Sequence, residues 1–241
     1  MIELRNVSCT YGEGSALAGI DLRIRAGEAL AVLGPNGCGK STLLKLLNGL
    51  VPARTGSYRF AGDEISPRRL QDPRAAKAFH QRIGLLFQNS DTQLFCPVVE
   101  DEIGFGPRQM GLPEPEVAQR VADCLDLLGI ASLRTRVPYH LSAGEKRMVA
   151  LASVLALNPE VLVLDEPLNG LDPRRKRFLG QLLGQLQAAG KTLICATHDF
   201  QNLEGVFQTA LVLGEDHRVA RIGPYAEVIA DQDFLRSQNI L

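Results

Sequence analysis

The sequence lacks the charge excess and the paired cysteines that mark several classes of protein. Its formal net charge is −1 and its pI about 6.4, so it has no basic surplus for wrapping nucleic acid. Short basic clusters, at Arg68-Arg69 and from Arg174 to Arg177, are typical of a solvated face. The five cysteines are an odd number without a CxxC pair, which argues against a disulfide framework or paired metal ligands. We therefore expect a protein of the reduced cytosol.

Long apolar segments are absent as well. No uncharged apolar run in the sequence approaches the roughly 18 residues that a membrane span requires. The stretch MIELRNVSCT includes Glu3 and Arg5 and has no apolar centre, so we expect no signal peptide there. A role at a membrane would then require a partner.

What the sequence does contain is enough apolar material for a sizeable core. Hydrophobic residues make up 45% of 241 positions, which allows one large domain or one domain with an inserted lobe. Residues 29–33, 161–165 and 192–196 are apolar on both faces and predict central, buried strands. Residues 2–7 alternate and predict a half-buried strand, and we expect further strands over 53–88.

Helical spacing alternates with these strands. It predicts a helix that follows the glycine-rich loop, includes Leu50 and stops at Pro52. It predicts further helices within 113–130, 142–158 and 172–190. Ser142 and Glu145 have the spacing of a capping box at the start of one of them. Residues 209–223 predict a hairpin, followed by short helices. Strands alternating with helices predict an α/β fold with a mostly parallel sheet, into which residues 90–158 insert a helical lobe.

The stretch GPNGCGKST, at 34–42, matches the phosphate-loop pattern G-x-x-x-x-G-K-[ST]. Its glycines let backbone N–H groups converge on an anion, and the helix that follows adds its positive end. Lys40 can reach the terminal phosphates, and the Ser41 hydroxyl can bind Mg²⁺. A purely structural glycine turn is the alternative. We predict that the whole segment contacts the nucleotide: Gly34, Pro35, Asn36, Gly37, Cys38, Gly39, Lys40, Ser41 and Thr42.

Two adjacent carboxylates end the second buried strand. Asp165 is at the usual position of a carboxylate that anchors Mg²⁺, and the alternation of the strand points Glu166 elsewhere, toward an attacking water. The alternative is an exposed loop start. No N-K-x-D motif for guanine is present in the sequence, so ATP is favoured over GTP.

The stretch LSAGEKR, at 141–147, is on physical grounds a well-capped helix start, which either has a structural role or holds an anion. It also resembles the LSGGQ signature of the ATP-binding cassette (ABC) ATPases, which stands just before an Asp-Glu strand. The resemblance implies that Ser142 and Gly144 close over the γ-phosphate bound to a second subunit.

The resemblance covers nearly the whole chain and implies roles for further residues. Tyr11 would stack on adenine, although a strand-end tyrosine is a serious alternative. Gln88 in LLFQN would sense Mg²⁺ and link to a membrane partner, and His198 in ATHD would contact the γ-phosphate. Asp172 would lie at the dimer interface. The implied catalytic residues are Lys40, Gln88, Glu166 and His198, and the implied Mg²⁺ ligands are Ser41, Gln88 and Asp165.

The family also implies a fold, namely a P-loop NTPase with N-terminal antiparallel strands. We expect one ABC ATPase domain over 1–241, with a RecA-like core at about 1–89 and 159–241 and a helical subdomain at about 90–158. Ala143 and Glu145 depart from the commoner Gly and Gln of the signature. Glu145 can still serve as the capping residue, so the departures put the rate of hydrolysis in doubt but not the fold.

The family includes proteins of transport, DNA repair and translation, so the kind of ABC protein that this chain represents must be inferred from other features. The chain has neither a long coiled-coil insertion nor a second cassette, which favours an importer subunit that pairs with itself or a paralogue. Residues 87–113 resemble the ATPases of energy-coupling factor transporters, and LSAGEKR and EPLNGLDP (166–173) resemble their cobalt/nickel branch. This implies ATP and Mg²⁺ as cofactors, a transmembrane coupling subunit, a substrate-binding membrane protein and a peripheral place on the cytoplasmic face of the membrane.

Three alternatives stay open. The same kind of subunit could import a vitamin, or the chain could be a soluble ABC ATPase that acts on macromolecules. A regulatory cassette without hydrolysis is disfavoured because Glu166 and His198 are both present. The sequence does not identify the solute, because the solute never touches this subunit.

Overall fold

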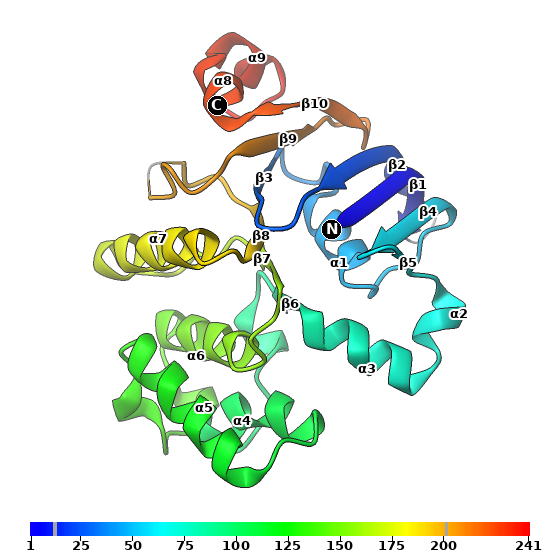
Figure 1. The fold of residues 1–241 in the computed structure, drawn as a ribbon. Coiled ribbons are helices and arrows are strands. Elements are labelled where there is room, and N and C mark those ends of the chain that lie inside the picture. The colour runs from blue at the N-terminus through cyan, green and yellow to red at the C-terminus, as the bar shows by residue number, and fades with distance from the viewer. Residues whose placement is uncertain (12–13, 201) are drawn as a thin grey trace.

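A computed structural model describes residues 1–11, 14–200 and 202–241, and its centre is a six-stranded sheet (Figure 1). The strand order is β10-β9-β3-β8-β7-β6, and all pairs are parallel except β9 with β10. The strands are β3 (Ala29–Leu33), β6 (Ile83–Leu86), β7 (Val161–Asp165), β8 (Thr192–Ala196), β9 (Thr209–Leu213) and β10 (Val219–Pro224). The predicted mostly parallel α/β sheet is confirmed.

The three strands predicted to be central, β3, β7 and β8, are buried along their whole length. Their register aligns Val32 with Ala196 and Ala196 with Asp165, so their carboxyl ends lie at one edge of the sheet. In open α/β sheets, ligands bind outside this edge. The phosphate loop follows β3, the Asp-Glu pair begins with the last residue of β7, and the ATHD segment begins with the last residue of β8.

A second, antiparallel sheet covers the phosphate-loop helix. Its strands, in the order β2-β1-β4-β5, are β1 (Ile2–Tyr11), β2 (Gly14–Ile24), β4 (Thr55–Phe60) and β5 (Asp63–Glu64). Helix α1 (Lys40–Leu47) buries four leucines in a core shared by both sheets. A register shift after Leu4, with Asn6 at φ 47°, keeps Val7 fully buried.

The helices between β6 and β7 are α4 (Val99–Gln109), α5 (Glu114–Leu127) and α6 (Ala143–Leu155), with short 3-10 turns at Ser90–Thr92, Ala131–Leu133 and Pro138–His140. Figure 1 shows them together on one side of the main sheet, in green. Their buried residues, such as Ile103, Val121 and Met148, belong to the same apolar core as Leu164 and Leu179. The inserted helical segment is therefore confirmed, whereas the proposed subdomain boundaries stay a prediction.

The remaining helices are α7 (Pro173–Ala188), α8 (Tyr225–Ala230) and α9 (Gln232–Ser237). Asp172 caps α7, and Gly190 follows its end at φ 90°, as the sequence pattern indicated. Within the described ranges, no helix has both the length and the apolar character that a membrane crossing needs.

Residues 34–88 contain the predicted strands, but two helices were missed there and the end of α1 was predicted wrongly. The stretch 53–88, expected to hold strands, also contains α2 (Pro67–Leu70) and α3 (Pro73–Arg82). Helix α3 buries only Phe79, and its other apolar residues after Pro73 are alanines, so it lacks the row of large apolar side chains by which the other helices were predicted. Helix α1 ends at Leu47, before the left-handed Gly49, rather than at Pro52. Leu50 accordingly lies outside the helix and is half exposed.

Two glycines of α7 provide a matched test of its packing. A Cβ on Gly180 would lie 2.1 Å from the carbonyl oxygen of Asn202, whereas a Cβ on Gly184 would have no neighbour within 4 Å. Gly184→Ala should raise the free energy of unfolding by about 0.5–1 kcal/mol, because alanine is the better helix former. Gly180→Ala should lower it, since the added methyl displaces the backbone. Urea unfolding measures both, and a stabilising Gly180→Ala would contradict this packing.

Candidate nucleotide site

The phosphate loop joins β3 to α1, and two of its glycines have no room for a side chain. A Cβ on Gly34 would lie 2.5 Å from the carbonyl oxygen of Leu213 and 2.6 Å from Cys38 Sγ. A Cβ on Gly39 would lie 2.4 Å from the carbonyl oxygen of Ala16. Both glycines also have positive φ, at 147° and 110°. The loop is therefore shaped by backbone, which leaves its N–H groups as the surface for an anion.

Lys40 begins α1 and folds back over this loop. Its Nζ donates to the carbonyl oxygens of Gly34, at 2.6 Å, and Pro35, at 2.9 Å. The ammonium is thereby held over the loop, beside the positive end of α1. This is the position from which a lysine can meet the terminal phosphates of a nucleotide.

Ser41 and Asp165 bring two oxygen ligands together beside the loop. The hydroxyl of Ser41 lies beside the carboxylate of Asp165, which is 6% exposed. Burial raises the pKa of Asp165, and the Ser41 hydroxyl and the charges of Arg147 and Lys40 partly oppose that rise. Within the described ranges, no cluster of three or more His, Cys, Asp or Glu side chains could hold a metal. The pair instead fits Mg²⁺, which commonly binds one or two protein groups together with phosphates and waters.

Glu166 and His198 form a pair across the ends of β7 and β8. The Nδ1 of His198 lies 2.9 Å from Oε2 of Glu166. Glu166 is 8% exposed and has φ 49°, a left-handed conformation that is uncommon for a non-glycine residue, and its N–H donates to Ala196 O at 2.9 Å. Backbone strain of this kind often occurs at functional sites. The pair places an exposed imidazole beside the Glu166 carboxylate, and the predicted role of Glu166 toward an attacking water stays a prediction.

The structure locates the backbone of two further predicted site residues, Gln88 and Tyr11. Gln88 follows β6, the neighbour of β7, and its side chain is exposed. It therefore lies close to the same edge of the sheet. Tyr11 is the last residue of β1, but its side chain lies outside the part of the chain that the structure describes. Adenine stacking by Tyr11 stays a prediction.

The signature segment begins α6 with the predicted capping box. Oε2 of Glu145 accepts hydrogen bonds from the backbone N of Ser142, at 2.8 Å, and from its hydroxyl, at 2.7 Å. The Ser142 hydroxyl in turn accepts from the N–H of Glu145, at 3.3 Å. These bonds lower the pKa of Glu145. The capping role of Glu145 is confirmed, and Ser142 stands exposed at the helix end.

Gly144 and Asp172 connect the signature to the start of α7. A Cβ on Gly144 would lie 3.1 Å from Nη1 of Arg175 and 3.2 Å from the carbonyl oxygen of Gly170, so the two segments pack closely. The exposed carboxylate of Asp172 accepts from the N–H groups of Arg174 and Arg175, at 2.9 and 3.0 Å. Within the chain Asp172 is a helix cap, and its role at a dimer interface stays a prediction.

Sequence reasoning missed Arg147, which is 2% exposed on α6. Its guanidinium donates to the carbonyl oxygens of Phe87, Asp165 and Glu166. Arg147 directly precedes the apolar run MVALASVLAL and has helical spacing to Leu151 and Val154, which was the available signal, because a charge on an apolar helix face requires partners.

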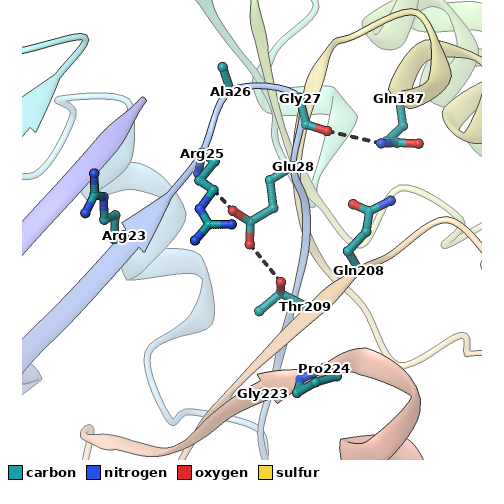
Figure 2. Close-up of a pocket in the computed structure, with 10 residues that line it drawn as sticks. All are labelled: Arg23, Arg25, Ala26, Gly27, Glu28, Gln187, Gln208, Thr209, Gly223 and Pro224. Carbon is teal, nitrogen blue, oxygen red and sulfur yellow. Dashed lines mark hydrogen bonds between the residues drawn. The ribbon is translucent and has the colours of Figure 1, made fainter.

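A cavity of about 670 Å³ lies at the opposite ends of the strands (Figure 2). Five residues of β3, or about 16 Å, separate it from the phosphate loop. Figure 2 shows that its polar groups serve the fold, because Glu28 accepts from the N–H of Arg25 and the hydroxyl of Thr209, and Gln187 donates to Gly27 O. We assign no ligand to it.

Comparison with known proteins agrees with this geometry. The ABC transporter family matches residues 17–169, more than half of the chain. The nickel import ATP-binding protein LarO of Lactiplantibacillus plantarum is 49% identical over 219 residues, or 91% of each chain. The energy-coupling factor transporter ATP-binding protein EcfA of Methanothermobacter thermautotrophicus is 38% identical over 241 residues, covering 100% of this chain and 76% of EcfA.

Among solved structures, cbiO1 of Clostridium perfringens, a part of the ABC transporter complex cbiONQ, superposes with a TM-score of 0.81. It shares 36% sequence identity, over 99% of this chain and 94% of its own. The resemblance to energy-coupling factor ATPases and to cobalt/nickel-type cassettes is thus confirmed, as is the ABC ATPase fold. The chain belongs to the ABC transporter family and carries its ATP-hydrolysing domain.

Proposed function

We propose that this chain is the ATPase subunit of an energy-coupling factor importer, and that ATP-dependent closure of two such subunits drives a transmembrane partner. The observation that carries the proposal is the convergence of Lys40, Ser41, Asp165, Glu166 and His198 at one edge of the sheet. The chain's likeness to LarO, EcfA and cbiO1 over most of its length supports the importer class.

In the proposed reaction, Glu166 orients a water for in-line attack on the γ-phosphate of ATP. Lys40 and His198 offset the negative charge that develops on the transferred phosphoryl group. Mg²⁺ would be held by Ser41 and Asp165, with Gln88 as a further ligand, and would neutralise phosphate charge when bound. The loop N–H groups and the end of α1 hold the remaining phosphate oxygens.

Dimer closure is proposed because Ser142, the residue that caps the signature helix, is exposed on the surface of one chain. Ser142 stands at the N-terminal end of α6, which carries a partial positive charge and is suited to an anion from outside. If the signature of one subunit caps the phosphate loop of another, each composite site needs two chains. Binding of ATP then favours the closed state by its differential affinity for it.

Glu166→Gln should trap this closed state, because the amide keeps the shape of the side chain but cannot serve as a base. We expect ATP to convert the variant from monomer to dimer in light scattering, with the wild-type chain under the same conditions as reference. Lys40→Ala in the same background should remain monomeric, since it removes the phosphate contact. A Glu166→Gln variant that binds ATP and stays monomeric would contradict the proposed closure.

The surface proposed to bind the transmembrane coupling subunit is a groove within the helical segment, lined by aromatic and aliphatic side chains together with the ion pair Lys146–Asp91. A cavity of about 430 Å³ is lined by Leu94, Phe95, Val137 and Tyr139, among others. Phe95 is 67% exposed and stacks edge-to-face on Phe105, and Tyr139 is 82% exposed. Exposed aromatic clusters of this kind mark partner sites. The groove includes part of residues 87–113, the stretch that resembles energy-coupling factor ATPases.

Capture of the tagged chain from native membranes tests the importer proposal. We expect the wild-type chain to recover a small transmembrane subunit and a substrate-binding membrane protein, identified by mass spectrometry. Phe95→Ser combined with Tyr139→Ser should lose both, because the groove loses its anchors. Phe178→Ser, at a partly exposed aromatic on α7, is the matched control that should retain them. Recovery of nucleic-acid or ribosomal partners alone would favour the soluble ATPase instead.

We further propose cobalt or nickel ions as the solute and a peripheral position at the cytoplasmic face of the membrane. The support for the ion is the similarity to a nickel import protein and to part of the complex cbiONQ. The alternative, a vitamin, involves the same kind of subunit. The identity of the recovered substrate-binding protein distinguishes the two.

A further inference from the structure

One buried arginine joins three parts of the nucleotide site. From α6, the guanidinium of Arg147 donates to Gln88 O, at 3.2 Å, and to Phe87 O. On its other side it donates to Asp165 O, at 2.6 Å, to Glu166 O, and to the carbonyl oxygen that follows, at 3.2 Å. A single side chain of the signature helix therefore contacts the backbone after β6 and the backbone after β7.

These partners are neutral backbone oxygens, together with the hydroxyl of Ser90 at 3.5 Å. Burial lowers the pKa of Arg147 to about 10, while the nearby charges of Asp165 and Glu166 act in the opposite direction. The group thus remains charged at neutral pH. A guanidinium presents five donors in a fixed plane, so it can serve both backbone segments at once, whereas a lysine ammonium is a compact donor on a flexible stem.

Both of the contacted segments carry residues assigned to hydrolysis. The peptide groups of Glu166 are held from two sides, since its N–H donates to Ala196 O on β8 and its carbonyl accepts from Arg147. This contact helps to retain the left-handed φ of 49° that sets the direction of the carboxylate. The backbone of Gln88 is fixed by the same guanidinium.

A second contact ties the segment after β6 to α6. Gln93 accepts from the N–H of Phe87 at 3.2 Å and donates to Ala150 O on α6 at 3.2 Å. The segment is therefore attached to the signature helix through both Phe87 backbone groups, because Arg147 binds the carbonyl.

We propose that Arg147 is a positioning residue for ATP hydrolysis, which fixes the backbones of Gln88 and Glu166 to the signature helix so that a displacement of α6 moves both. The inference rests on the proposed roles of Gln88 and Glu166. Arg147 acts through these residues and not on ATP itself, so its loss should affect turnover more than nucleotide binding.

Arg147→Lys tests this, because it keeps the charge and loses the planar set of donors. We expect kcat for ATP to fall by about tenfold to a hundredfold, as small misplacements of catalytic groups do. KM and the affinity for a fluorescent ATP analogue should stay within about threefold, because Lys40 and the phosphate loop are untouched. Assays run well below the melting temperature, with circular dichroism as a check that the chain is folded.

Arg120→Lys is the matched control. Arg120 also donates to a backbone carbonyl, Ala156 O at 3.0 Å, but on α5, without a contact to either segment of the site. It should keep the wild-type kcat. Unchanged kcat in Arg147→Lys, or a fall explained by the unfolded fraction or by lost ATP affinity, would overturn the inference. Absence of hydrolysis by the wild-type chain would instead overturn the proposed function.

Discussion

The phosphate loop depends on a close approach of backbone to backbone, and the rest of the site is arranged around it. The loop is wedged between the end of β9 and the strand β2, so that methyl groups at Gly34 and Gly39 would collide with the carbonyl oxygens of Leu213 and Ala16. The antiparallel sheet thus has a direct part in the site, because it forms one wall of the loop. With side chains excluded, N–H groups and the end of α1 provide the binding surface.

The order of the strands then determines which groups meet the loop. Because β3, β8 and β7 are adjacent and parallel, His198 and the Asp165-Glu166 pair follow strand ends that lie beside the loop. Asp165 faces Ser41, and Glu166 turns toward His198 through its left-handed backbone. The helical segment reaches the same edge through Arg147. Residues from four separated stretches of the chain therefore meet at this edge of the sheet.

Much of this site was predictable because its parts are local in sequence. The phosphate loop, the buried strands and the capping box of Ser142 and Glu145 each have a short pattern with a physical cause. Helix α3 was missed because it buries only Phe79 and is otherwise marked by alanines, without a row of large apolar side chains. Arg147 was missed because its partners lie up to 60 residues away in the chain. No local sequence pattern indicates such a contact. The Glu166–His198 pair, 32 positions apart in the chain, likewise became visible only in the three-dimensional structure.

The central claim is that each chain holds half of two composite sites, with the loop of one chain facing the signature of the other. The most direct test mixes the variants Lys40→Ala and Ser142→Arg, each inactive alone. In a mixed dimer one site carries both substitutions and the other carries neither. The account predicts that the mixture regains ATP hydrolysis. Mixed dimers, shown to form by two affinity tags, that remain inactive would contradict it, as would full hydrolysis by Ser142→Arg alone.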